Sequence, residues 1–399
     1  MFLGLPRTVV ALGLVSLCMD TSSEMIHSLL PLYLVAGLGA SAAMLGLLEG
    51  IAEATASLMR VFAGVLSDRM ARRKPLILAG YGLAALAKPL FPLAAGVGAV
   101  LLARVADRIG KGIRGAPRDA LLADVTPPAL RGAAFGLRQS LDTVGAVLGP
   151  VGAVLLMGAL NDDVRAVLWV AVLPALLAVL VIVVLVQEPE ATRPAPRAAA
   201  ALHRHEIAQL SPAFWRVAWL GVLLSLARFS EAFLLLRASD LGMVTAQVPL
   251  VLAALNIVYA FSAYPLGRLS DRLGRGRLLV AGLAALVLAD VLLALDTGPW
   301  PFAAGILLWG LHMGATQGVI AALVADAAPA RLRGTAFGVL HCTSAVALLA
   351  ASVIAGGLWS ALGAAATFMA GALFALVAGV VAACSGAVHG GGLKTNSPS

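Results

Sequence analysis

The sequence has little charge, few aromatic residues and almost no cysteine. Only 12% of its 399 residues are charged and 6% are aromatic, whereas 61% are hydrophobic. A soluble core does not need apolar residues at this density, so a soluble multidomain protein is excluded. The three cysteines, Cys18, Cys342 and Cys384, are scattered through apolar segments. They indicate neither a disulfide framework nor a cysteine metal site.

Motifs for nucleotide binding and for catalysis are also missing. The GKG within RIGKGIRGA, residues 108–116, lacks the spacing of a Walker loop, and no strand pattern precedes it. No nucleophile with a base and no metal cluster is evident, so we expect no enzyme, no cofactor and no bound metal. The net charge is +8, but the basic residues are spread over short loops, which argues against nucleic-acid binding.

Long apolar runs dominate the chain instead. A helix needs about 20 apolar residues to cross a bilayer, and runs of that length recur from end to end. The alternation typical of membrane strands is absent, so the spans are helical. The sequence predicts twelve spans, at about 8–36, 43–67, 75–95, 97–123, 132–159, 165–187, 214–238, 246–269, 277–296, 300–325, 334–360 and 364–385.

Lys and Arg are distributed unequally between the two sets of loops. With the N-terminus inside, the loops on the opposite side keep little beyond Arg165 and Arg237. Positive charge gathers on the cytoplasmic side of membrane proteins, so we expect both termini to be cytoplasmic. The cytoplasmic segments contain Arg7, Arg69, Arg72, Arg73, Lys74, Arg131, Arg193, Arg197, Arg204, Arg268, Arg272, Arg275, Arg277, Arg331, Arg333 and Lys394.

The two halves of the chain repeat each other. GVLSDRMARRK at 64–74 returns as GRLSDRLGRGR after 203 residues, and ADVTPPALRGAAFG at 123–136 returns as ADAAPARLRGTAFG after 202. A common offset of half the chain indicates two related six-helix units. We therefore predict an all-α polytopic membrane protein of twelve transmembrane helices in two pseudo-symmetric bundles. Its parts are a bundle at 1–187, a cytoplasmic linker at 188–212, and a bundle with a short tail at 213–399.

The loop after the second span resembles the signature loop of the major facilitator superfamily. The resemblance covers essentially the whole chain and implies a transporter that works by alternating access. In that family the loop helps to stabilise the outward-facing state. Asp124 and Asp326 precede the repeated RG-x-AFG, and each is expected to pair with an Arg of the loop in its own half. The residues of the two loop copies are Gly64, Asp68, Arg69, Arg72, Arg73 and Lys74, and Gly267, Asp271, Arg272, Arg275 and Arg277.

Charge also enters the membrane, most densely in the fourth span. Arg104, Asp107, Lys111, Arg114 and Arg118 share one side of that helix, with Arg108 and Asp119 beside them. Lipid does not tolerate such a stripe, so it faces the bundle interior or an aqueous cavity. By resemblance, Arg108 is the Arg of a fourth-span motif implicated in proton handling in related exporters, and Lys111 departs from its usual Gln.

Seven acids and eight bases lie in the spans of the first half, and two interpretations stay open. The charges form a neutralising ion-pair network, or some of them contact substrate or protons. Carboxylates in an apolar bundle can become protonated near neutral pH, and Asp20, Glu24 and Glu53 are the candidate proton carriers. The candidate coupling or substrate residues are Asp20, Glu24, Glu49, Glu53, Arg108, Lys111, Arg114, Arg118, Arg138 and Asp142.

Residues 145–155, GAVLGPVGAVL, resemble the motif of the antiporter branch of the superfamily, through Gly145, Gly149, Pro150 and Gly152. This resemblance favours efflux coupled to proton entry. We predict a monomeric exporter of a small organic compound or metabolite in the bacterial inner membrane. Its partners are the substrate, protons and the lipid bilayer. Proton-coupled uptake of a polar nutrient or metal ion is the alternative, and His27 on the face of Asp20 and Glu24 keeps a metal substrate open. A non-transporting membrane receptor or a membrane enzyme is a further alternative.

Overall fold

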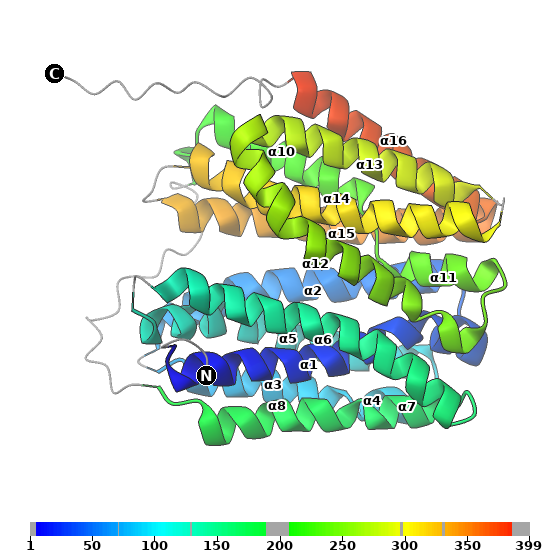
Figure 1. The fold of residues 1–399 in the computed structure, drawn as a ribbon, viewed down its shortest axis with the longest axis horizontal. Coiled ribbons are helices and arrows are strands. Elements are labelled where there is room, and N and C mark those ends of the chain that lie inside the picture. Colours follow the sequence, from blue (N-terminus) through cyan, green and yellow to red (C-terminus); the bar gives the residue numbers. More distant parts are fainter. Residues whose placement is uncertain are drawn as a thin grey trace. The chain divides into compact units, whose positions relative to one another are not determined.

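The computed structural model describes residues 5–70, 72–127, 130–188, 207–295, 298–328 and 332–384. All regular structure in these ranges is helical (Figure 1), which confirms the predicted fold class. The elements are α1 (Arg7–Leu32), η1 (Tyr33–Gly37), α2 (Ala42–Arg69), α3 (Lys74–Ala87), α4 (Leu90–Leu93), α5 (Val97–Val125), α6 (Arg131–Ala159), α7 (Val164–Val170), α8 (Val172–Leu185), α10 (Pro212–Ala227), α11 (Ala232–Asp240), η3 (Thr245–Gln247), α12 (Leu250–Leu273), α13 (Arg275–Ala294), α14 (Pro299–Ala327), α15 (Arg333–Leu362) and α16 (Ala364–Cys384).

The helices follow the predicted spans closely, and three spans consist of two helices each. The third span is α3 with α4, the sixth is α7 with α8, and the seventh is α10 with α11. Within the described ranges, ten helical segments are long and apolar enough to cross a membrane. Most of the predicted linker, at 189–206, and the tail at 385–399 lie outside the described residues.

Polar side chains fix where several helices begin. The Ser41 hydroxyl accepts a hydrogen bond from the Met44 amide at 3.2 Å, and Ser211 accepts one from Phe214 at 3.1 Å. Each satisfies an amide that has no partner within its own helix. Pro212 follows Ser211 as the first residue of α10, a position where the missing N–H costs nothing. Serine caps therefore set the start of α2 and α10.

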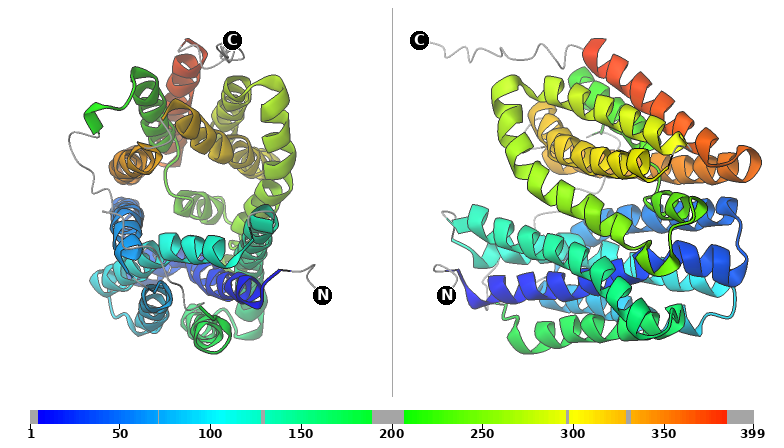
Figure 2. Two further views of the ribbon diagram at one scale, coloured as in Figure 1. Left: turned by 90° about the vertical axis from the view of Figure 1, so that its left-hand side faces the viewer. Right: turned by 45° about the vertical axis from the view of Figure 1, so that its right-hand side comes forward.

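The chain divides into two compact units. Unit 1 comprises Met1–Ala201, Ser230–Ala253 and Leu348–Ser360, and unit 2 comprises Leu202–Phe229, Ala254–Ala347 and Ala361–Ser399. In unit 1, α1 packs along α6 and α8, while α5 packs on α2 and α3. In unit 2, α13 packs on α14 and α16, and α10 packs on α16 (Figure 2).

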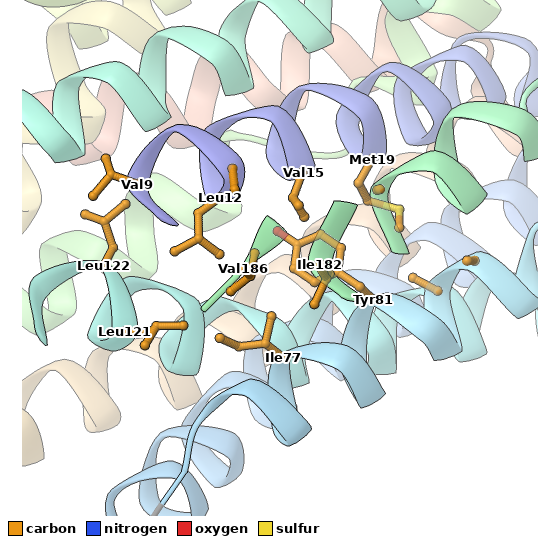
Figure 3. Packing of buried hydrophobic residues seen from close by; sticks show 14 of the residues in the cluster. Val9, Leu12, Val15, Met19, Ile77, Tyr81, Leu121, Leu122, Ile182 and Val186 are labelled. Carbon is orange, nitrogen blue, oxygen red and sulfur yellow. The ribbon is translucent and has the colours of Figure 1, made fainter. Parts of the chain in front are cut away.

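The apolar core of unit 1 joins four spans (Figure 3). Leu12, Val15 and Met19 of α1 meet Tyr81 of α3 and Ile182 of α8, and all five are fully buried. Leu121 and Leu122 of α5 complete the contact. This core fixes the rotation of α1 and α5 about their own axes, so the polar residues elsewhere on both helices point to the opposite side of the packing surface.

Candidate functional site

The charged stripe of α5 faces the interior of unit 1. Arg104, Asp107, Arg108 and Arg114 are each at most 4% exposed, although α5 also has exposed apolar residues such as Leu102. The expectation of an inward-facing stripe is met by these four side chains. Their partners come from α1, α2 and the end of α3, and they form two groups of contacts.

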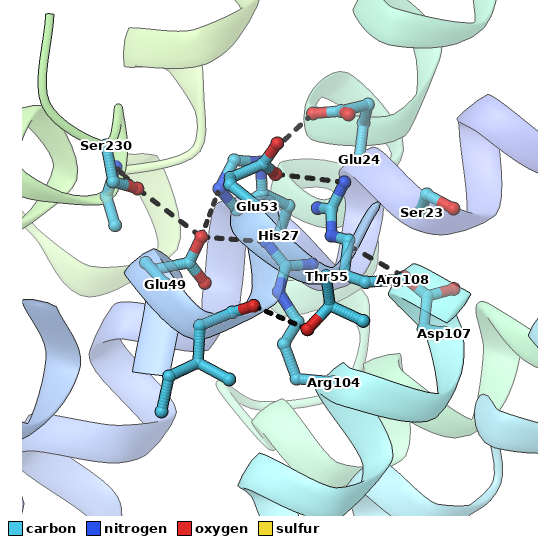
Figure 4. A network of polar contacts seen from close by, with 12 residues as sticks. Ser23, Glu24, His27, Glu49, Glu53, Thr55, Arg104, Asp107, Arg108 and Ser230 are labelled. Carbon is cyan, nitrogen blue, oxygen red and sulfur yellow. Dashed lines mark hydrogen bonds and ion pairs between the residues drawn. The ribbon is translucent and has the colours of Figure 1, made fainter. Parts of the chain in front are cut away.

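The first group, which we call the histidine cluster, surrounds His27 of α1 (Figure 4). The Nδ1 atom of His27 lies 3.4 Å from Glu24 Oε2, and its Nε2 atom lies 3.7 Å from Glu49 Oε2. Glu49 Oε2 also accepts hydrogen bonds from Arg104 Nη2 at 2.9 Å and from the Ser230 hydroxyl at 3.3 Å. One imidazole therefore links two carboxylates from neighbouring spans.

Arg108 and Lys88 extend this group toward α3. Arg108 Nη1 lies 3.1 Å from Glu53 Oε1, and Arg108 Nε lies 3.9 Å from Asp107 Oδ2. On its other side Asp107 accepts a hydrogen bond from Lys88 Nζ at 2.8 Å, and Lys88 also donates to the Ser23 hydroxyl at 2.9 Å. Glu53 is the most exposed of these acids, at 37% of its side chain, so it is the member most open to solvent or ligand.

The second group, the carboxyl-pair cluster, centres on Asp20 of α1 and Asp142 of α6. The two carboxyl groups lie close enough for the charge of one to affect the other. Arg114 Nη2 lies 3.6 Å from Asp20 Oδ1, and its guanidinium carbon is 4.5 Å from the centre of the Tyr81 ring. Arg138 Nη1 lies 3.5 Å from Asp142 Oδ2. Each acid of the pair therefore has a base of its own in addition to the other acid.

Arg118 connects the carboxyl-pair cluster to the rest of α5. Its Nη1 atom donates to the hydroxyls of Ser16 at 3.1 Å and Tyr81 at 3.3 Å, and lies 3.9 Å from Asp142 Oδ1. Its Nε atom donates to Asp119 Oδ1 at 3.0 Å. With four partners, Arg118 is held firmly in place.

The antiporter-like segment of α6 lets α1 come close enough for this arrangement. A methyl group added at Gly149 would lie 2.7 Å from the Thr21 carbonyl oxygen and 2.9 Å from Glu24 Cβ. At Gly145 it would lie 2.6 Å from the Leu17 carbonyl oxygen. Only glycine permits such backbone contact, and Pro150 lies inside the same helix. Gly152 faces the end of the Met25 side chain.

Two bases in these spans have no ion pair with any described residue. Lys111 lies among the charges of Arg108, Glu53, Glu24 and Asp20, yet none of the described carboxylates comes within ion-pair distance of it. Arg60 of α2 is likewise without an ion pair in the described ranges. The charges of these two cations are therefore not paired with any described acid.

At the first copy of the signature loop, Arg73 is the residue that pairs with Asp124. The Arg73 Nε atom lies 3.0 Å from Asp124 Oδ2, and its Nη1 donates to Ser67 at 2.6 Å. Glu188 accepts hydrogen bonds from the amides of Arg73 at 2.7 Å and Lys74 at 2.9 Å. The loop is thus tied to α5 and to Glu188, three residues beyond the end of α8.

The other loop residues are less informative. A methyl group added at Gly64 would lie 3.6 Å from Ala116 of α5, whereas one added at Gly267 would have no described atom within 4 Å. Arg72 and Arg272 are exposed, and Arg275 begins α13. The side chains of Asp68, Arg69, Asp271 and Asp326 lie outside the described residues, so the pairing expected for Asp326 is untested.

Sequence reasoning missed the part that His27 and Lys88 play. The sequence placed His27 on the face of Asp20 and Glu24, but it did not show that His27 bridges Glu24 and Glu49. The spacing of Glu24 and His27, three residues apart on one helix, is the signal that could have indicated the first contact. Lys88 was counted only as one of the bases, because nothing in the sequence shows which acid it meets.

Unit 2 contains fewer charges, and they are arranged differently. Asp290 of α13 is fully buried, and its Oδ1 atom accepts a hydrogen bond from Trp309 Nε1 at 3.1 Å. His312, also fully buried, lies with Nδ1 2.8 Å from the Gly282 carbonyl oxygen. Among the described residues of this unit, no ion pair joins two buried charges as the ion pairs of α5 do.

Comparison with known proteins agrees with this architecture. The sequence profile of the Major Facilitator Superfamily matches residues 12–238 and 229–397. An uncharacterized MFS-type transporter of Methanocaldococcus jannaschii is 30% identical over 384 residues, covering 94% of each chain. The multidrug resistance protein MdtH of Photorhabdus laumondii is 30% identical over 144 residues, 36% of this chain and 35% of that protein.

The fold is also found among solved structures. A transporter of the POT family in complex with a thioalcohol-conjugated peptide superposes with a TM-score of 0.80 at 13% identity, covering 96% of each chain. The internal repeat, the helical spans, the signature loop and the match along nearly the whole length lead to one conclusion. The chain belongs to the Major Facilitator Superfamily, and it is a multi-pass membrane transporter and not an enzyme.

Proposed function

We propose that this transporter exports a small organic compound or metabolite in exchange for protons, by alternating access. The observation that carries the proposal is the contact between Asp20 and Asp142. Two carboxylates so close to each other repel, and one proton shared between them removes that repulsion. Such a pair binds and releases a proton as one unit, which is the property that a coupling site needs.

The bases around the pair supply a reason for coupling between proton and substrate. Arg114 lies 3.6 Å from Asp20 and Arg138 lies 3.5 Å from Asp142. When the pair loses its proton, its added negative charge strengthens the attraction to both bases. When the pair gains a proton, these bases and the unpaired Lys111 are freer to bind an acidic or polar substrate. Protonation of the pair and binding of the substrate are thus linked through the same bases, and this linkage by itself does not select exchange over uptake.

Export is supported by the helix that carries Asp142. The antiporter-like glycines of α6 hold α1 close, and Asp20 and Glu24 lie on α1 at that contact. The multidrug resistance protein that matches part of the chain supports the same direction. Proton-coupled uptake of a polar nutrient is the second candidate, because the carboxyl pair by itself would serve either direction.

We extend the proposal to the setting of the protein. We propose a bacterial inner membrane location, and the excess of Lys and Arg in alternate loops supports an orientation with both termini in the cytoplasm. The repeat supports bundles at 1–187 and 213–399 that move against each other, and we propose that a monomer suffices. Glu24 and Glu53 remain candidate proton carriers, and Asp124 with Arg73 is proposed as a latch between states.

Transport in proteoliposomes tests the proton site. Substrates are first identified by comparing small molecules retained by cells with and without the gene, where accumulation in the deletion strain indicates export. Asp20→Asn and Asp142→Asn should each lower substrate-driven proton flux by tenfold or more, as expected for loss of an essential proton carrier. Asp162→Asn is the control, because Asp162 lies in an exposed loop. Wild-type flux in both carboxyl variants would rule out this coupling site.

A further inference from the structure

We infer that Arg228, Gln317 and Tyr259 of unit 2 form a binding site for a carboxylate group of the transported compound. This inference rests on the proposed function and names the chemical class of its substrate. The three residues come from three spans, α10, α14 and α12, and each keeps part of its surface exposed. None of them was among the site residues expected from the sequence.

Arg228 stands at a break in the seventh span. Helix α10 ends at Ala227, Arg228 has φ −113° and ψ 76°, and α11 begins at Ala232. Residues 228–231 are therefore not helical although they lie near the middle of the segment Pro212–Asp240, which is long and apolar enough to cross a membrane. Non-helical backbone at that depth is tolerated where it lines a cavity or a binding site.

Gln317 orients the guanidinium group. With the amide turned so that its oxygen faces Arg228, Oε1 accepts hydrogen bonds from Nη2 at 3.2 Å and Nη1 at 3.3 Å. The amide nitrogen then donates to the Tyr259 hydroxyl at 2.9 Å. In the opposite orientation the amide N–H groups would meet the N–H groups of Arg228, which is unfavourable because neither can accept. The chain from Tyr259 to Arg228 is thus fixed by its donors and acceptors.

Close packing of α12 on α14 places Tyr259 beside Gln317. A methyl group added at Gly310 would lie 2.7 Å from the Leu255 carbonyl oxygen and 3.0 Å from Val258 Cβ. One turn of α14 separates this contact from Gly314, which lies against Ser262. The supporting residues therefore lie on rigid helices, and the site does not depend on a loop for its geometry.

Arg228 has no acidic partner within the described part of the chain. Arg237 pairs with Asp240 at 2.7 Å, and the buried arginines of α5 each meet an acid, but no described carboxylate forms an ion pair with Arg228. The Gln317 oxygen accepts from two of the five N–H groups of Arg228, and it adds no negative charge. An unpaired guanidinium inside a membrane is costly, and a carboxylate can satisfy it with two parallel hydrogen bonds.

The depth of Arg228 favours a substrate over a lipid. Sixteen residues separate it from Pro212 at the start of the span. At 1.5 Å per residue this is roughly 24 Å of helix, well beyond the headgroup region. A lipid phosphate would need to leave the interface to reach this guanidinium, whereas a small soluble carboxylate would not.

Thermal unfolding of the purified full-length protein in detergent tests the site. Acetate, benzoate and succinate serve as carboxylate probes, and benzamide is the neutral match for benzoate. At least one carboxylate should raise the unfolding midpoint of the wild type, and benzamide should not. Arg228→Gln should weaken the apparent affinity by at least tenfold, as expected for loss of a charged two-bond contact. Arg268→Gln removes the same charge from an exposed position and should respond as the wild type does.

Gln317→Glu provides a test that does not depend on the choice of probe. It places a carboxylate where the amide oxygen now meets Arg228, so it should occupy the site from within. This variant should unfold at a higher temperature than the wild type and lose the carboxylate response. The gain should vanish when Arg228→Gln is combined with it. The inference would be overturned if Gln317→Glu changed the unfolding temperature equally in the wild type and in Arg228→Gln. It would also be overturned if none of the three carboxylates raised the unfolding midpoint of the wild type.

The proton proposal and this inference fail separately. The probe measurement involves no proton gradient, so a response lost in Arg228→Gln is read independently of proton coupling at Asp20. If Asp20→Asn retains full proton flux while Arg228→Gln loses the probe response, the coupling site is wrong and the carboxylate site holds. If Arg228→Gln responds to the probe as the wild type does, the carboxylate site is wrong whatever the flux.

Discussion

Lys88 and Asp107 form a buried ion pair between the third and fourth spans, with Nζ 2.8 Å from Oδ1 and neither side chain more than 3% exposed. In the second half, Asp290 corresponds to Lys88 and Trp309 corresponds to Asp107. Both are 202 residues further along the chain, which is also the offset between ADVTPPALRGAAFG and its copy. There Trp309 Nε1 donates to Asp290 Oδ1 at 3.1 Å. Both halves therefore link the same pair of spans through a buried polar contact. In the first half a base neutralises the acid, and in the second an indole binds it.

Breaking the first of these contacts should be costly. Lys88→Met leaves Asp107 buried beside Arg108 alone, and removal of one member of a buried pair destabilises proteins by about 3–5 kcal/mol. The double variant Lys88→Met with Asp107→Leu should be more stable than Lys88→Met, because it leaves no unpaired charge. Thermal or denaturant unfolding in detergent measures both. A double variant as unstable as the sum of the two single variants would contradict this account.

The second contact should depend on the indole and not on the charge of the acid. Trp309→Phe removes the donor to a fully buried oxygen, at an expected cost of about 1–3 kcal/mol in the free energy of unfolding. Asp290→Asn keeps an oxygen that can accept the same bond and should stay within about 1 kcal/mol of the wild type. If Asp290→Asn proved less stable than Trp309→Phe, Asp290 would need a cationic partner that the described residues do not show.

The packing of α6 on α1 can be tested with matched glycines. Gly149→Ala forces a methyl group against the Thr21 carbonyl oxygen, so it should destabilise the protein by about 1–3 kcal/mol and lower transport. Gly158→Ala is the control on the same helix, where nothing lies within 4 Å. Alanine favours a helix over glycine, so this control should be neutral or slightly stabilising. Equal losses at the two positions would show that close contact is not the reason for glycine at 149.

The contact of Arg73 with Asp124 should affect the balance of states more than stability. Asp124 is 42% exposed, and exposed pairs contribute about 0–1 kcal/mol. Asp124→Asn should therefore leave the unfolding midpoint nearly unchanged and shift the labelling rates of single cysteines placed at the two ends of the spans. Asp163 has a different structural role as a helix cap, so Asp162→Asn is the better matched control. Unchanged labelling in Asp124→Asn would remove the latch from the proposed cycle.

The spans themselves could be predicted from the sequence because the membrane imposes their length. The run expected at 132–159 is the helix Arg131–Ala159, and the run expected at 364–385 is Ala364–Cys384. The apolar thickness of a bilayer requires about 20 residues per span, and the Pro, Gly and charged residues between runs mark the turns. The inward direction of the α5 stripe was equally predictable, since lipid excludes it.

The partners of the charges could not be predicted in the same way. Helical spacing places Glu49 and Glu53 on one face of α2, but it does not show that Glu49 would meet Arg104 and His27 while Glu53 meets Arg108. The seventh span was expected to be continuous over 214–238, and the break at Arg228 was missed. Composition fixes whether a segment can enter the membrane, whereas a local break depends on contacts with other spans.

The sequence by itself determined that the chain crosses a membrane as helices, that its halves are copies, and that charge lies inside the first half. Hydrophobic length, the repeat and the cost of charge in lipid are properties of the chain alone. Tertiary structure decided which side chains meet, because helix rotation and the close approach allowed by glycines select the partners. It brought Asp20 close to Asp142, and it left Arg228 beside an amide, with no described acid as an ion-pair partner.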